Sequence, residues 1–213
     1  MLLSALISGL GLGSMYGLMA LGFYVTYAVS GTVNFAQGSS MMLGAVLTFA
    51  FAQTLGWPLW AAIVLALALC ALYGLVVEFV AVRPFARRGS DAWLMATVAL
   101  GIVLDNLVLF TFGKEPRSLP SPLAQTPLNL GDVGLGLYPL QVLIPVVGLA
   151  LAAVLHLLSR RTRWGTGMLA VVQNPSAARL MGIPIQRAIA LAFALSALFA
   201  GIAGVLIAPL FNV

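Results

Sequence analysis

Residues 58–82 read "PLWAAIVLALALCALYGLVVEFVAV", an apolar run whose one charged residue, Glu78, comes near its end. A helix needs about 20 predominantly apolar residues to cross a hydrocarbon core about 30 Å thick. The run is long enough for that, so it predicts a transmembrane helix.

Similar apolar runs recur along the whole chain. Of its residues, 62% are hydrophobic and 7% are charged, whereas soluble domains carry about 25% charged residues. The sequence therefore predicts an all-α, polytopic helical membrane protein in which residues 1–213 form a single transmembrane domain. We expect about six spans, at roughly 5–29, 39–56, 58–82, 92–112, 139–158 and 188–210.

The charged residues of the connections predict the orientation in the membrane. Segment 83–91 carries three Arg and one Asp, and segment 159–187 carries five Arg and no acid. An excess of Arg and Lys marks cytoplasmic loops. Segment 113–138 balances two basic and two acidic residues, so it is expected on the opposite side. Extrapolating this alternation backwards places the N-terminus outside.

The stretch "SGTVNFAQGSSMMLG", residues 30–44, is too short and too apolar for an ordinary solvated loop. We interpret it as a broken helix at membrane depth, which is tolerated only where protein buries the backbone or a water-filled cavity meets it. Transport paths are often built this way. Asn34, Gln37 and Gly38 are therefore candidate path residues. A plain turn whose amides satisfy local backbone groups is the alternative.

Ionisable groups inside a membrane are costly and raise a functional hypothesis. Asp105, beside Asn106 in the fourth expected span, faces either a substrate path or a neighbouring helix to which it hydrogen-bonds. Glu78 is expected to pair with Arg83 or to extend to the interface, both structural roles.

Small residues recur every four positions in the first and last expected spans. This spacing lets helices approach closely in lipid, so we interpret both stripes as packing surfaces. They are Gly9, Gly13 and Gly17, and Ala200, Gly204 and Ala208.

Catalytic motifs do not occur in the sequence. It has no phosphate-binding GxxxxGK[ST] loop, no GxSxG elbow and no metal-ligand spacing of Cys and His. We therefore expect no enzyme, no metal site and no cofactor bound by this chain.

Residues 174–184, "NPSAARLMGIP", form a polar island among the apolar runs. Asn174 is a good N-cap, Pro175 suits the first helical position, and Gly182 suits a left-handed stop. The stretch predicts a helix of about two turns, which is too short to be stable alone in water.

The end of this helix carries an apolar tip on a segment that is expected in the cytoplasm. The tip consists of Leu180, Met181 and Ile183. Burial against a partner would contribute ~1.5–3 kcal/mol per side chain. A helix lying on lipid with Arg179 and Arg187 in the headgroups is the alternative.

These residues also carry a resemblance. "SAARLMG", residues 176–182, resembles the EAA-x-x-x-G loop of ABC importer permeases, with Ser176 in place of the Glu. The stretches 163–209 and 9–45, and the "RPF" after the third span, resemble the branched-chain amino acid permeases of the LivH type. The resemblance covers essentially the whole chain.

The resemblance implies a multi-pass subunit of the bacterial inner membrane. Such a permease works with a second permease subunit, with two cytoplasmic ATPase subunits that use ATP, and with a periplasmic binding protein that delivers branched-chain or similar apolar amino acids. By position, segment 113–138 would face the binding protein, and the turn at 34–38 would lie near the path. The helix that couples to the ATPase would comprise Ser176, Ala177, Ala178, Arg179, Leu180, Met181, Gly182 and Ile183.

Three positions depart from the family pattern, which usually has His at Gln37 and Gln at Asp105 and commonly has Arg at Phe79. Asp105 leaves the solute open, and urea or a short amide is the alternative. Family members continue through further spans, so we expect this chain to be incomplete at its C-terminus. A structural or assembly subunit that does not transport is therefore a further alternative.

Overall fold

The computed structural model describes residues 2–86, 88–113, 119, 128–129 and 136–210. Six helices in this part are long: α1 (Leu2–Ser30), α2 (Gln37–Phe49), α3 (Leu59–Val76), α5 (Trp93–Phe112), α7 (Pro139–Arg161) and α10 (Ile185–Ile207). The shorter elements are the π-helices η1 (Ala50–Thr54) and η2 (Val77–Val82), the helices α4 (Arg83–Ala86), α8 (Arg163–Gln173) and α9 (Pro175–Leu180), and the antiparallel strands β1 (Leu128–Asn129) and β2 (Gly136–Leu137).

The all-α, polytopic membrane fold is confirmed. Five stretches of the described chain are long and apolar enough to cross a membrane: Ala5–Ser30, Leu59–Ala86, Trp93–Phe112, Pro139–Arg161 and Ile185–Ile207. The sixth expected span, 39–56, is not among these five stretches. There α2 runs directly into η1, and both are preceded by a non-helical segment at 31–36.

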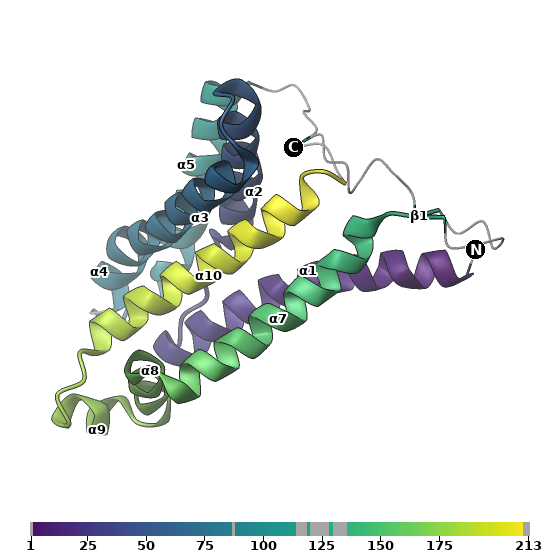
Figure 1. The fold of residues 1–213 in the computed structure, drawn as a ribbon. Coiled ribbons are helices and arrows are strands. Elements are labelled where there is room, and N and C mark those ends of the chain that lie inside the picture. The colour runs from purple at the N-terminus through teal and green to yellow at the C-terminus, as the bar shows by residue number, and fades with distance from the viewer. Residues whose placement is uncertain (1, 87, 114–118, 120–127, 130–135, 211–213) are drawn as a thin grey trace.

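Helix α10 is the central element of the bundle. It lies between the group α2, α3 and α5 on one side and the pair α1 and α7 on the other (Figure 1). Of its most apolar window, 56% is buried, compared with 28% or less for the other four candidate spans. The backbones approach so closely that a Cβ on Gly204 would overlap the Met41 carbonyl, and one on Gly74 would overlap the Phe193 carbonyl.

The two small-residue stripes behave differently. Ala200, Gly204 and Ala208 are buried against α2 and its surroundings, as expected of a packing surface. Gly9, Gly13 and Gly17 pack on nothing within the described residues, since a Cβ at these positions would meet nothing within 4 Å. Helix α1 packs through another face, formed by Gly11, Met15, Leu18 and Gly22.

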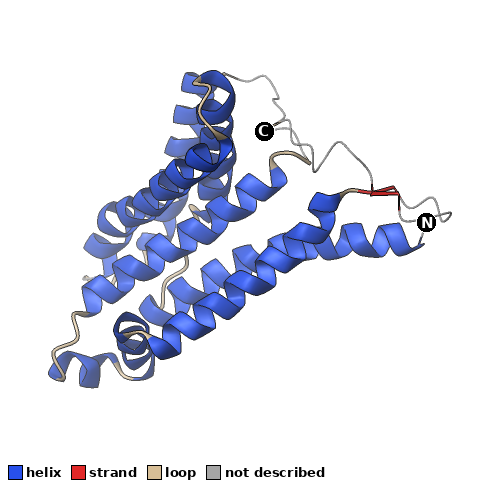
Figure 2. Cartoon of the chain, viewed as in Figure 1, coloured by secondary structure: helices blue, strands red, loops and turns tan. Residues whose placement is uncertain are grey.

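The segments rich in Arg lie at one end of the bundle. Ile189, near the start of α10, packs both on the cluster around Val82 and on the cluster around Val171 and Ala178. Figure 2 shows the short helices of this end at the lower left, and the N-terminus at the opposite end. There the starts of α1 and α7 and the end of α10 line a pocket of about 340 Å³. The Arg-rich segments and the start of α1 thus lie at opposite ends of the bundle, and which end faces the cytoplasm stays a prediction.

Candidate functional site

Buried polar side chains gather around segment 31–36, where the chain passes from α1 to α2. They come from α1, α2, α5, α10 and the segment itself, and we call them the polar seam: Thr26, Thr32, Asn34, Gln37, Ser39, Ser40, Thr97 and Ser196. Thr26 and Thr97 donate to backbone carbonyls of their own helices, and Ser40 donates to the Ala36 carbonyl just before α2. The seam is uncharged, and protein buries it on all sides.

Gln37 ties three helices together from the first position of α2. Its Nε2 donates to the Met19 carbonyl of α1 over 2.8 Å, and its Oε1 accepts from the Ser196 hydroxyl of α10 over 3.1 Å. Gly22 makes room for this amide, because a Cβ there would overlap Nε2. Met19 and Ser196 both lie near the middle of their helices, so α2 begins at about half the depth of the bundle.

Asn34 is fully buried three residues before α2. Its Oδ1 accepts from the Ala36 backbone N–H over 3.1 Å, which fixes which end of the amide is oxygen. In the part of the chain that the structure describes, its Nδ2 is the buried side-chain polar atom left without a hydrogen-bond partner. A buried polar group without a partner costs about 1–3 kcal/mol, so Nδ2 can donate to an acceptor that the described residues do not supply.

The other three candidate path residues are not buried as Asn34 and Gln37 are. Gly38 and Asn106 are exposed on the surface of the chain, and the Asn106 amide donates to its own helix at the Ile102 carbonyl. Asp105 is half-buried, and no hydrogen bond of its carboxylate to a neighbouring helix is found within the described residues. The roles of all five in a path stay predictions.

Glu78 and Arg83 form the ion pair expected from the sequence. The guanidinium binds both carboxylate oxygens, with distances of 3.0 Å from Nε and 2.8 Å from Nη2. The side chain of Glu78 is 3% exposed and that of Arg83 is 27% exposed, with the Phe79 ring 5.0 Å below the guanidinium. The pair joins the π-helix η2 to α4 and neutralises a buried acid.

The short helix α9 has the capping chemistry predicted for it. Asn174 accepts through Oδ1 from the Ala177 N–H over 3.0 Å, and Pro175 occupies the first turn. Gly182 has φ +80°, which favours glycine. The Ile183 N–H then donates back to the Ala178 carbonyl over 3.0 Å, which closes the helix.

Side chains of α9 and its C-terminal turn divide into an inner and an outer set. Ala178 is buried, and Ile183 packs against the same cluster beneath it. Leu180 and Met181 are 90% and 82% exposed. The apolar tip therefore consists of Leu180 and Met181 alone. The prediction was wrong for Ile183, because the closure of the helix turns this side chain inward.

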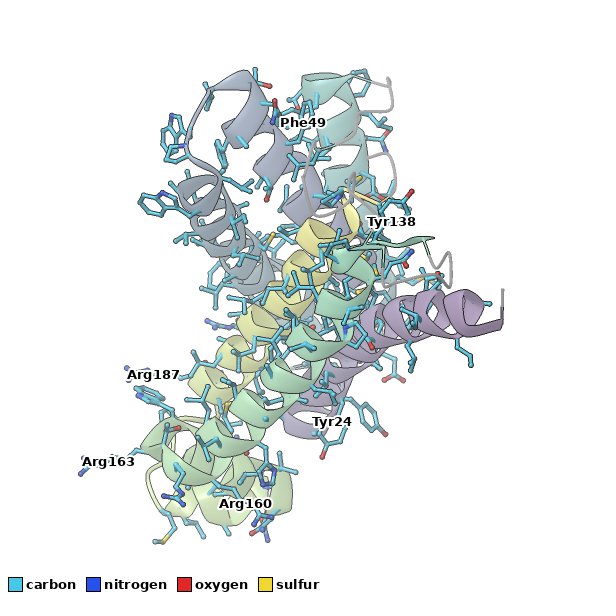
Figure 3. The ribbon with its side chains drawn as sticks, turned by 45° about the vertical axis from the view of Figure 1, so that its right-hand side comes forward. Tyr24, Phe49, Tyr138, Arg160, Arg163 and Arg187 are labelled. Carbon is cyan, nitrogen blue, oxygen red and sulfur yellow. The ribbon has the colours of Figure 1, made fainter. Side chains whose placement is uncertain are left out.

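Helix α8, which precedes α9, was missed by the sequence analysis. The Thr162 hydroxyl caps it by accepting from the Gly165 N–H over 3.0 Å. Gly165 and Val171 are buried, while Trp164 is 62% exposed. The cap at Thr162 and the apolar spacing of Met168 and Val171 were available signals. Figure 3 shows Arg160, Arg163 and Arg187 at this end of the bundle.

A metal centre is not formed by the described residues, among which no three His, Cys, Asp or Glu side chains are grouped. The site thus consists of a buried polar seam at half depth and an exposed two-residue apolar tip at the Arg-rich end.

Comparison with known proteins identifies the family. Residues 5–213 match the family model described as branched-chain amino acid transport system / permease component. The chain is 31% identical to the high-affinity branched-chain amino acid transport system permease protein LivH of Escherichia coli, over 99% of this chain and 72% of that protein.

Two further relatives show the breadth of the similarity. The permease protein BraD of Pseudomonas aeruginosa is 28% identical over 99% of this chain and 72% of its own. The guanosine ABC transporter permease protein NupQ of Bacillus subtilis is 26% identical over 82% of this chain and 58% of its own. No solved structure matches. With a family model that covers nearly the whole sequence, the chain belongs to the permease components of branched-chain amino acid transport systems.

Proposed function

We propose that this chain is a membrane-spanning subunit of an ABC importer that moves branched-chain or similar apolar amino acids across the bacterial inner membrane. A periplasmic binding protein delivers the solute. Two cytoplasmic ATPase subunits drive transport, a second permease subunit completes the path, and this chain forms one transmembrane domain of the assembly.

The observation that carries the proposal is the exposed tip of α9. Leu180 and Met181 are almost fully solvated on a helix that is capped at both ends and braced by Ala178 and Ile183. A rigid two-residue apolar projection fits a groove on a protein partner. With Ser176–Ile183 as the coupling helix, the ATPase supplies that groove.

The polar seam supports the transport role. Uncharged hydrogen-bonding groups are buried at half depth, at a helix that begins inside the bundle. Interrupted helices at the midplane are the usual setting of solute sites in membrane transporters. Asn34 and Gln37 form the part of the path contributed by this chain.

Co-purification with the ATPase tests the assignment of the tip. The double substitution Leu180→Asp and Met181→Asp should abolish association, because it places two charges in an apolar groove. Leu55→Asp is the matched control, since Leu55 is 57% exposed at the other end of the bundle. Association unchanged by the double substitution would contradict the coupling role.

Reconstitution tests the solute. Proteoliposomes that contain the chain with its ATPase, second permease and binding protein should accumulate leucine only when ATP is supplied. Urea and guanosine serve as comparison solutes, because a short amide is the alternative from sequence and one relative is named for guanosine. Uptake of either in preference to leucine would replace the proposed solute, and no ATP-dependent uptake of any would refute transport.

A further inference from the structure

The start of α2 and the amide of Asn34 occupy an unusual place for polar groups. The Gln37 side chain contacts the middles of α1 and α10, so the first turn of α2 lies at half depth, where lipid surrounds the bundle. A helix carries a partial positive charge at its N-terminus, equivalent to roughly half an elementary charge. Helix α2 has 13 residues, so this charge is developed in full.

The free N–H groups of this first turn are only partly used. The Asn34 side chain accepts from Ala36 N–H, and the Asn34 carbonyl accepts from Gln37 N–H over 3.2 Å. Within the described residues, the N–H groups of Gly38 and Ser39 have no acceptor. The helix therefore presents, at half depth in the bundle, N–H groups that no acceptor among the described residues satisfies.

The orphan Nδ2 of Asn34 is an independent observation at the same place. The amide is held against the start of α2 by its own Oδ1, so Nδ2 lies beside the first turn of the helix. It is fully buried, and donors buried without a partner are rare in native proteins. An unpaired side-chain donor and the unpaired N–H groups of the helix start thus lie within five residues of each other in the chain, and both can donate to an acceptor oxygen.

Resting on the proposed function, we infer that Asn34 and the first turn of α2 form a site for the carboxylate of the transported solute. A carboxylate supplies acceptor oxygens and the negative charge that the helix terminus favours. Glu78 is neutralised by Arg83, and Asp105 is half-buried one helical turn beyond Gly101, which packs against Ser39 of α2.

The substitution Asn34→Ser separates binding from folding. A serine hydroxyl still accepts from the N–H two residues on, which keeps the turn into α2, but it is too short to replace Nδ2. Because the lost donor has no hydrogen-bond partner among the described residues, the thermal stability should not fall. Hydrogen bonds to charged groups are strong, so the rate of leucine uptake at saturating binding protein should fall about 10- to 100-fold.

Thr48→Ala is the matched control, since Thr48 is buried in α2 but its hydroxyl is satisfied by the Gly44 carbonyl over 2.8 Å. It should leave uptake of leucine within about twofold of the unsubstituted chain, because it removes no orphan donor. Asn34→Asp, which places an acceptor where the donor stood, should lower uptake at least as far as Asn34→Ser.

Competition identifies the group that is bound. Binding of labelled leucine to the purified permease complex, without binding protein, should be displaced by isovalerate, which keeps the carboxylate, and not by isoamylamine, which lacks it. Equal displacement by both compounds, or an Asn34→Ser complex that transports leucine at the normal rate, would overturn the site while leaving the transport function standing. Absence of ATP-dependent uptake by the unsubstituted complex would overturn the function itself.

Discussion

Ser196 and Gln37 are 159 residues apart in the chain, yet the hydroxyl of Ser196 donates to Oε1 of Gln37 over 3.1 Å inside the bundle. The same amide reaches the Met19 carbonyl. One side chain thus fixes where the start of α2 lies relative to α1 and α10.

Gln37→Leu should lower the thermal stability of the protein in detergent, by about 1–3 kcal/mol, because it removes two interhelical hydrogen bonds and leaves the Ser196 hydroxyl without its acceptor. Gln37→His should lower the thermal stability less than Gln37→Leu does, since an imidazole can keep one of the two hydrogen bonds. Equal unfolding temperatures for Gln37→Leu and the unsubstituted chain would show that the bridge contributes nothing.

Gly204→Val should prevent folding, because a Cβ at this position would overlap the Met41 carbonyl and the helices α2 and α10 would have to separate. Gly13→Val is the matched control, with nothing within 4 Å of its Cβ. Yield and monodispersity in detergent measure the difference. A well-folded Gly204→Val variant would refute the close packing of these two helices.

Arg83→Gln should destabilise the protein more than Glu78→Gln does. Removing the cation strands an acid whose side chain is 3% exposed, whereas Arg83, at 27%, retains access to water. Breaking a buried pair by removing one partner costs about 3–5 kcal/mol. Thermal unfolding in detergent measures both variants, and the double variant Glu78→Gln, Arg83→Gln should recover part of the loss. The reverse order of the two single variants would contradict the burial assigned to Glu78.

Asn174→Ala should loosen α9 by about 1 kcal/mol, because the Ala177 N–H loses its cap. Binding of the ATPase, measured by titration, should weaken by roughly fivefold, while the unfolding temperature of the bundle stays the same. Asn174→Asp keeps an acceptor at the cap and should bind normally. If Asn174→Ala also binds normally, the ordering of α9 does not limit docking.

Thiol labelling should confirm the orientation. Cys70 is the one cysteine of the sequence and is buried, so an added surface cysteine is labelled selectively. Ser176→Cys and Ser90→Cys should react with an impermeant maleimide only after the membrane is opened. Thr54→Cys, at the opposite end, should react in intact spheroplasts. Labelling of Ser176→Cys in intact cells would show that the topology is the reverse of the one proposed.

The features of the fold that depend on the length of apolar runs and on residues close together in the chain could be predicted from the sequence. The runs of apolar residues located the spans, the cap residues located α9, and Glu78 lies close enough to Arg83 in the chain for pairing to be expected. The choice of packing face on α1 could not be predicted, because Gly9, Gly13 and Gly17 have the same spacing as a true contact stripe. That choice is made by the helices that surround α1.

Contacts between distant segments in the candidate site could not be predicted from the sequence either. Asn34 and Gln37 were recognisable as polar residues in an apolar turn, but the contact with Ser196 joins distant segments and leaves no local pattern. The inward turn of Ile183 likewise depends on the cluster beneath α9. The sequence showed which residues were unusual, and the tertiary structure determines what each one meets.

The connection between α9 and α10 is only four residues long, from Met181 to Pro184. It is braced by the bond from Ile183 N–H to Ala178 and by the bond from Arg187 N–H to the Pro184 carbonyl. No slack loop separates the exposed tip from the central helix. One continuous helix therefore joins the exposed tip to the buried turn: Ser196, eleven residues from the start of α10, holds Gln37 at the start of α2.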